Sequence, residues 1–270
     1  TSRRIKKIAA KIAEALQIHG PFNIQFIAKD NDVQVIECNL RASRSFPFVS
    51  KVSKVNFIDL ATRIIMGEVV TPLNGSFGEL DYVGVKAPQF SFTRLKGADP
   101  TIGVEMASTG EVACLGDDFE EAFLKAVLSA GSRMPVKAAL LSPGPVEAKA
   151  ACLDSARRLQ QMGVTIYATQ GTGEFLGANG VEATILHWPL EDKTPNVLEY
   201  LAGGSIDLVI NIPKNYQESE LTNDYVIRRK ASDHAIPLIT NIQLAQRFVE
   251  ALTRKRLEDL HVKSWGHYPG

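Results

Sequence analysis

The sequence predicts an α/β protein whose second half contains a five-stranded parallel sheet. Strand-like and helix-like segments alternate from Val136 onward, which is the pattern of a parallel sheet covered by helices on both faces. The composition, 45% apolar and 22% charged, is that of an ordinary globular protein. The predicted strands are 137–141, 164–169, 181–187, 206–211 and 236–240. The predicted helices are 145–162, 172–179, 194–203, 223–235 and 241–257.

The first half predicts a helix, a hairpin and two more helices. Apolar residues recur every three or four positions over 5–16, which is typical of an amphipathic helix. Two β-rich runs, 22–28 and 33–36, flank a turn-rich connection and predict a hairpin. Helical periodicity returns over 56–66 and 117–130, and each of these segments stops at a glycine.

A chain of 270 residues favours two domains over one. Residues 69–102 are richer in glycine and proline, and the alternation of strands and helices starts only after the helix over 117–130. We therefore expect domains at 1–131 and 132–270.

Charge and cysteine content exclude several classes of function. Thirty basic residues balance thirty acidic ones, so there is no net charge to attract nucleic acid or an acidic membrane. No apolar run approaches the roughly 20 residues that a membrane span requires. Cys38, Cys114 and Cys152 lie far apart, which predicts neither disulfides nor a zinc site.

A group of polar residues directly follows the hairpin's second apolar run. Glu37 and Asn39 lie two positions apart, so on a strand they point from the same face. A carboxylate beside an amide oxygen suits a hard cation, and Arg41 and Arg44 just beyond suit the phosphates that such a cation accompanies. The alternative is an exposed strand end with ordinary charges.

The hairpin register decides whether a third polar residue joins this group. If the turn is centred on Asn31, Gln25 lies directly opposite Glu37, and Gln25, Glu37 and Asn39 share one face. A turn centred half a residue away would lose that pairing.

The runs at 22–26, 36–51 and 103–112 resemble the end of the second ATP-grasp domain of carbamoyl phosphate synthetase large subunits. The resemblance covers essentially the whole chain. It implies the C-terminal lobe of an ATP-grasp domain in 1–131, and a methylglyoxal-synthase-like, Rossmann-type five-stranded domain in 132–270.

The resemblance also implies roles for the polar group. Residues matching Gln25, Glu37 and Asn39 would hold Mg²⁺ (or Mn²⁺) at the ATP phosphates, and those matching Arg41 and Arg44 would line the phosphate side. The parent enzyme makes carbamoyl phosphate from bicarbonate, ammonia or glutamine nitrogen, and two ATP. The chain lacks an initiator Met, and we expect the nucleotide-binding lobe upstream, so the fragment alone is expected to be inactive.

In open parallel sheets, ligands bind beyond the carboxyl ends of the strands. The predicted strand 164–169 ends at Thr169 and is followed by a glycine-containing turn with Thr172 at the start of a helix. Backbone N–H groups and the dipole of such a helix start favour an anion. The alternative is that Thr172 is only an N-cap. Trp188 and Asn211 follow neighbouring strands.

Other charged residues in this half have structural interpretations. His187 and His234 have no partnered carboxylate at catalytic spacing, so a structural role is favoured for each. The basic run 228–230 is typical of a solvated helix face, and its alternative is a phosphate or carboxylate site.

In the family, the terminal domain binds regulatory effectors: nucleotides and ornithine in bacteria, UTP in pyrimidine-pathway enzymes, and N-acetylglutamate in the ammonia-dependent enzyme. Thr169, Thr172 and Trp188 match the spacing of the N-acetylglutamate pattern, and Asn211 matches after a shorter loop. Two departures stand against this match. Lys214 replaces an expected Asn, although Asn215 is adjacent, and Asp224 stands where an Asn is expected, with Asn223 one place earlier.

We therefore expect N-acetylglutamate as effector, with UTP as the alternative. The implied partners are the rest of the synthetase polypeptide and a glutaminase domain or subunit. The implied compartment is the mitochondrial matrix, favoured over the cytoplasm. Two alternative functions remain. One is a methylglyoxal-synthase-like lyase, which would need catalytic carboxylates beside the phosphate loop, although no Asp cluster follows Thr172. The other is a free-standing effector-binding module.

Overall fold

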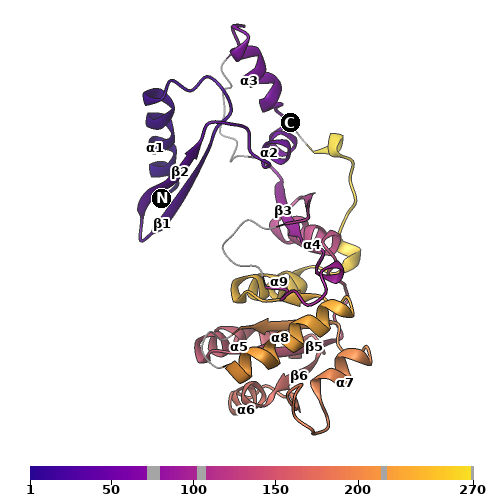
Figure 1. Ribbon diagram of the computed structural model, residues 1–270. Helices are drawn as coiled ribbons and strands as arrows, with labels where there is room; N and C mark the ends of the chain where they lie inside the picture. The colour runs from indigo at the N-terminus through magenta and orange to yellow at the C-terminus, as the bar shows by residue number, and fades with distance from the viewer. Residues whose placement is uncertain (72–79, 102–107, 214–217, 269–270) are drawn as a thin grey trace. The chain divides into compact units, whose positions relative to one another are not determined.

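The computed structural model describes residues 1–71, 80–101, 108–213 and 218–268 (Figure 1). Contacts group the chain into two compact units, each described separately below. The first comprises Thr1–Asp81 with Ser264–Gly270, and the second comprises Tyr82–Lys263.

The first unit contains the predicted helix and hairpin and one helix that the sequence did not predict. Its elements are α1 (Ser2–Ala15), β1 (Asn23–Lys29), β2 (Asp32–Asn39), α2 (Phe46–Ser53) and α3 (Phe57–Ile65). The helix α2 was missed because it has only eight residues and carries a proline in its first turn. A proline is tolerated there, since the first N–H groups of a helix have no partner within it.

The hairpin pairs Gln25 with Glu37, as predicted, but for a different reason. Its turn consists of Asp30 and Asn31, both with positive φ (48° and 65°), so it is centred between them and not on Asn31. Phe26 accordingly pairs with Val35, and a bulge at Ile36 then restores the register that brings Glu37 opposite Gln25.

The second unit begins with an antiparallel pair, β3 (Val83–Gln89) and β4 (Gly110–Gly116), on which α4 (Phe119–Ser129) packs. The helix α4 also contacts α9 (Ile242–Arg254), which covers the parallel sheet. Residues 82–131 therefore belong to the same compact unit as the parallel sheet. The expected boundary at 131 concerns where one family domain ends and the next begins, and it stays a prediction.

The five-stranded parallel sheet is confirmed, in the order β7-β6-β5-β8-β9. Its strands are β5 (Ala138–Pro143), β6 (Thr165–Thr169), β7 (Thr184–Leu186), β8 (Leu208–Ile212) and β9 (Leu238–Ile239). The remaining helices are α5 (Val146–Gln161), α6 (Gln170–Ala178), α7 (Val197–Ala202) and α8 (Glu218–Asp233). The predicted ranges fit closely, except that β7 and β9 are shorter and α8 starts five residues earlier.

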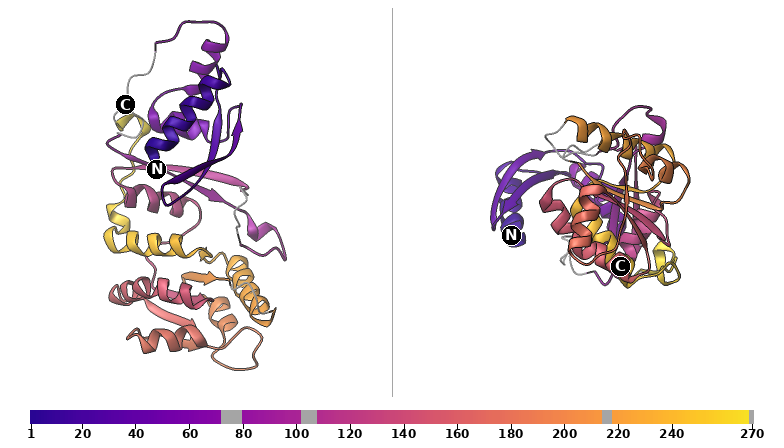
Figure 2. Two further views of the ribbon diagram at one scale, coloured as in Figure 1. Left: turned by 90° about the vertical axis from the view of Figure 1, so that its left-hand side faces the viewer. Right: turned by 90° about the horizontal axis from the view of Figure 1, so that it is seen from below.

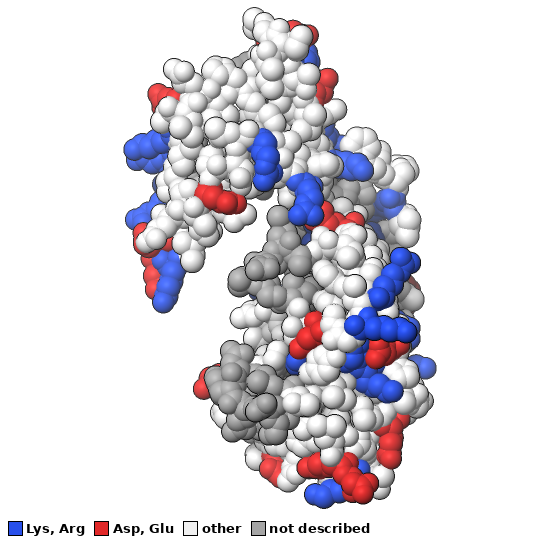
Figure 3. Space-filling view, viewed as in Figure 1, with Lys and Arg blue, Asp and Glu red and all other residues white. Residues whose placement is uncertain are grey.

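Successive residues of β5 face two separate cores. Ala139 and Leu141 pack with α4, α5, α6 and α9, whereas Leu140 packs with α7 and α8. Helices therefore cover both faces of the sheet, as the alternation predicted (Figure 2). On the face shown in Figure 3, basic and acidic side chains are interspersed. Among the described helices, none combines the length and apolarity of a membrane span.

The interpretation of the run 228–230 as a solvated helix face is wrong for its two arginines. Arg228 is only 2% exposed, and its Nε donates to Oδ1 of Asp99 at 2.7 Å. Arg229 is 8% exposed and donates to the backbone carbonyls of Phe92, Leu95 and Ala98. The arginines therefore attach α8 to the segment after β3.

Replacing Arg228 with methionine is expected to lower the free energy of unfolding by about 2–3 kcal/mol, because it leaves Asp99 and the buried carboxamide oxygen of Asn211 without their donor. This loss is at the low end for a buried ion pair, since the Asp99 side chain is 37% exposed. Urea unfolding of the chain measures the loss. Arg247→Met is the matched control, because Arg247 is 65% exposed and pairs with Glu250 on its own helix. Equal losses in the two variants would contradict the structural role of Arg228.

Candidate functional sites

Three predicted metal ligands lie together on one face of the hairpin. The Nδ2 of Asn39 donates to Oε1 of Glu37 at 2.8 Å, and Gln25 is the direct cross-strand partner of Glu37. Gln25 and Glu37 are exposed, and Asn39 is half-buried. The set offers one carboxylate and two carboxamide oxygens from adjacent strands.

This donor set fits Mg²⁺. Hard cations prefer carboxylate and carbonyl oxygens, and Mg²⁺ is typically held by one or two carboxylates together with substrate phosphates. The Nδ2 of Asn39 donates to Glu37, so the Oδ1 of Asn39 is the atom of that carboxamide that can bind a cation. Within the described residues, no cluster of three or more His, Cys, Asp or Glu offers a different kind of metal site.

The arginines lie in the loop between β2 and α2. Arg41 and Arg44 are both exposed, and Arg41 Nη1 makes a long hydrogen bond to the carbonyl of Ala42, at 3.3 Å. The structure thus places two guanidinium groups just beyond the strand that carries Glu37 and Asn39, as predicted.

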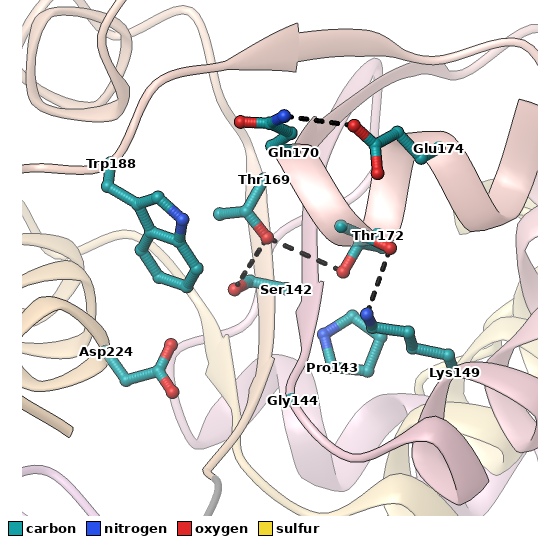
Figure 4. Close-up of a pocket in the computed structure, with 11 residues that line it drawn as sticks. Ser142, Pro143, Gly144, Lys149, Thr169, Gln170, Thr172, Glu174, Trp188 and Asp224 are labelled. Carbon is teal, nitrogen blue, oxygen red and sulfur yellow. Dashed lines mark hydrogen bonds between the residues drawn. The ribbon is translucent and has the colours of Figure 1, made fainter. Parts of the chain in front are cut away.

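A second site is a cavity of about 230 Å³ at the carboxyl ends of β5 and β6 (Figure 4). Its lining includes Ser142, Lys149, Thr169, Thr172, Trp188 and Asp224. Parallel strands end together at this edge, so hydroxyls from β5, β6 and α6 converge there. The three predicted residues Thr169, Thr172 and Trp188 all line it.

The interpretation of Thr172 as an N-cap is wrong. The N-cap of α6 is Thr169, and its hydroxyl makes no capping bond. Instead its Oγ1 lies 3.3 Å from Ser142 Oγ and 3.5 Å from Thr172 Oγ1, and both threonines are almost completely buried. Thr169 therefore does not cap the first N–H groups of α6, which a helix leaves without backbone partners and which suit an anion.

Lys149, which the sequence did not single out, brings a positive charge to the same place. It projects from the first turn of α5, and its Nζ donates to the carbonyl of Gly171 at 2.9 Å. A methyl group on Gly171 would lie 3.2 Å from that Nζ, so glycine suits the close approach. Gly173 is required more strictly, because its Cβ would lie 2.5 Å from Cγ1 of Ile185 on β7.

The opposite wall consists of Trp188 and Asp224. Asp224 is 1% exposed and accepts a hydrogen bond from Nδ2 of Asn211 at 2.8 Å. Asn211 is fully buried beneath the cavity, where it also accepts from Arg228 Nη1. Asn211 thus supports the wall and does not line the cavity.

Asn223 also acts from outside the cavity. Its Oδ1 accepts from the backbone N–H of Leu190 at 3.0 Å, which fixes the loop after Trp188. The other two predicted effector residues, Lys214 and Asn215, lie outside the described residues, as does most of the 103–112 run.

Neither predicted histidine is among the residues that line the cavity. The expectation that His187 has no partnered carboxylate is wrong, because its Nδ1 lies 3.1 Å from Glu191 Oε2. His234 is exposed. The three cysteines are free, as predicted, and burial raises the pKa of Cys152 to about 11. A thiol with so high a pKa is a poor nucleophile at neutral pH.

The two sites correspond to two known families. Residues 1–72 match the family described as "Carbamoyl-phosphate synthase L chain, ATP binding domain", and residues 151–240 match the "MGS-like domain". The chain therefore joins a segment of an ATP-binding domain to an MGS-like domain.

Several relatives are similar to this chain over nearly its whole length. The multifunctional protein pyr1-3 of Dictyostelium discoideum is 50% identical over 94% of this chain and 12% of its own length. The multifunctional protein CAD of Squalus acanthias is 47% identical over 93% of the chain and 12% of its own length. The mitochondrial carbamoyl-phosphate synthase (ammonia) of Homo sapiens is 46% identical over 98% of the chain and 18% of its own length.

The chain belongs to the carbamoyl-phosphate synthase family and corresponds to the C-terminal region of its large subunit. It spans less than a fifth of the length of these relatives.

Proposed function

We propose that this chain belongs to an ATP-dependent synthetase that makes carbamoyl phosphate, and that its first unit serves the phosphorylation of carbamate. Glu37, Asn39 and Gln25 would hold Mg²⁺, which supplies charge neutralisation at the ATP phosphates. Arg41 and Arg44 would bind and orient the phosphate oxygens. Catalysis of phosphoryl transfer consists largely of such positioning and electrostatic stabilisation.

We further propose that the cavity in the second unit binds a small anionic effector. The observation that supports this most is the uncapped start of α6 with Lys149 beside it and buried hydroxyls below. Asp224 lies on the other wall, so the effector's anionic group belongs at the α6 end.

N-acetylglutamate is the proposed effector, and UTP is the alternative. The spacing of Thr169, Thr172 and Trp188, which matches the N-acetylglutamate pattern, favours that ligand. The relatives do not separate the two, because they include both a synthase named for ammonia and multifunctional proteins.

Isothermal titration of the chain with N-acetylglutamate, UTP, UMP and ornithine, side by side, tests the site and its specificity. The expected result is binding of N-acetylglutamate that Lys149→Gln weakens. Binding of UTP alone would correct the effector and keep the site. Binding of none, or binding that Lys149→Gln leaves unchanged, would overturn the site.

The partners in this proposal are the rest of the synthetase polypeptide and a glutaminase domain or subunit. The mitochondrial matrix is the proposed compartment, favoured over the cytoplasm by the same argument that favours N-acetylglutamate.

The chain alone is expected to show no ATP turnover. Two of its three predicted metal ligands, Gln25 and Glu37, lie exposed on a two-stranded sheet, and half of a site does not hold ATP in reacting geometry. ADP release by the purified chain with Mg²⁺ and bicarbonate measures this. The Glu37→Gln chain gives the background from copurifying enzymes. Turnover that this substitution abolishes would contradict the expectation.

A further inference from the structure

The segment after α9, residues 255–268, makes specific contacts in both units. We name it the strap. It contains two short 3₁₀ turns, Leu257–Asp259 and Trp265–His267, and no longer helix. In Figure 1 it is the yellow segment beyond α9. The chain passes from the second unit to the first within it, between Lys263 and Ser264.

In the second unit, the strap is held by the acidic start of α4. Lys255 Nζ lies 2.7 Å from Asp118 Oδ2, and Lys263 pairs with Asp117. Between them, the backbone N–H of His261 donates to Oε1 of the buried Glu121 at 3.1 Å. The hydrogen bond from Lys263 lowers the pKa of Asp117 from its ordinary 3.8, so this pair persists at neutral pH and is lost only as the pH falls through that lowered value.

In the first unit, the strap ends on the last turn of α2. Nε1 of Trp265 donates to the carbonyl of Lys51 at 2.8 Å, and the Lys54 ammonium donates to the carbonyl of Trp265 at 2.6 Å. The same ammonium lies 3.9 Å from the centre of the indole ring. The final carbonyls of a helix have no partner within it, so Trp265 satisfies a group that α2 cannot satisfy itself.

The helix α2 depends on such outside contacts. Eight residues are too few for a helix to persist on local hydrogen bonds, and only Ser53 of α2 is buried. Ser45, its N-cap, directly follows Arg44, so the position of α2 sets where the arginine loop ends.

We propose that Trp265 is a positioning residue for the phosphate-binding loop. By holding the end of α2, the strap fixes Arg44, and because its other end is held on α4, it links that loop to the unit that carries the effector cavity. This inference rests on the proposed role of Arg44.

The first test uses the chain itself. In Trp265→Ala, amide hydrogen exchange of residues 46–54 is expected to accelerate on the order of 10-fold, since local opening becomes easier. Val262→Ala is the matched control, because Val262 lies in the strap but is 99% exposed. Unchanged exchange in Trp265→Ala would overturn the proposal, and unchanged circular dichroism confirms that the variant is folded.

The second test uses the full-length synthetase. Trp265→Ala is expected to raise the KM for ATP on the order of 10-fold with a smaller change in kcat, because substrate positioning is lost. Trp265→Phe, which keeps an aromatic ring but lacks the N–H, is expected to show a smaller rise in the KM for ATP. The Kd of the effector is expected to stay unchanged.

A double-mutant cycle then tests the link between the two ends. The pair Lys255→Gln with Lys263→Gln releases the α4 end, and Trp265→Ala releases the α2 end. If the strap acts as one continuous link, the loss of effector response in the combined variant equals the loss in either variant alone. If the two ends act independently, the two losses add. Additive losses would overturn the link.

Arg44→Met reports on the proposed function separately. If Arg44→Met keeps full activity, the phosphate role is wrong. If Arg44→Met loses activity while Trp265→Ala keeps a normal KM for ATP, the proposal for the strap alone is wrong.

Discussion

Glu37→Gln is expected to lower carbamoyl phosphate formation by the full-length synthetase on the order of 10²-fold or more, about 3 kcal/mol of transition-state stabilisation. Glu37 is the one carboxylate in the donor set, so the substitution removes its only negative charge. A neutral amide keeps the shape and still accepts a hydrogen bond from Asn39, which isolates the effect of charge on the metal ion.

Initial rates at saturating Mg²⁺ measure this effect. Glu68→Gln is the matched control, because Glu68 is an exposed carboxylate of the same unit that pairs with Arg63, away from the proposed donor set. Its activity is expected to stay near that of the unsubstituted enzyme. Because Glu37 is exposed, its substitution leaves the melting temperature nearly unchanged. Near-normal turnover of Glu37→Gln would show that the metal-ligand assignment is wrong.

The parallel sheet was predictable because buried parallel strands and amphipathic helices differ in the period of their apolar residues. The hairpin shows where such reasoning stops. Alternation indicates which residues share a face, but the bulge at Ile36 depends on how the two-residue turn fits the ladder. The predicted pairing of Gln25 with Glu37 was confirmed, although the assumed turn centre was wrong.

Residues whose partners are distant in the sequence were not predictable. Arg228 and Arg229 look like a solvated basic run, because Asp99 and the backbone carbonyls that accept from them lie more than 125 residues earlier, in the segment 92–99. Lys149 was missed for a similar reason, since only the packing of α5 beside α6 brings it to Gly171. The strand-end rule did find Thr169, Thr172 and Trp188, because it needs only the order of strands and helices.

Thr172→Val is expected to weaken effector binding roughly 10- to 150-fold, because it removes a hydrogen bond to a charged group worth about 1.5–3 kcal/mol. Thr172 is a cavity-lining residue in the first turn of α6, and valine matches its shape. Basal activity of the full-length enzyme without effector is expected to stay nearly unchanged, since the proposed chemistry lies in the other unit.

Titration with N-acetylglutamate and thermal unfolding, both on the same variant, separate binding from stability. The hydroxyl contact that the substitution removes, to Thr169 Oγ1, is long at 3.5 Å, so the melting temperature is expected to change little. Thr165→Val is the matched control, because Thr165 is exposed at the start of β6, the strand whose far end leads into α6. A purely structural Thr172 would give the opposite pair of results: the melting temperature would fall and the affinity would hold. That combination would exclude Thr172 from the effector site, whereas lost affinity at constant stability places its hydroxyl against the effector's anionic group.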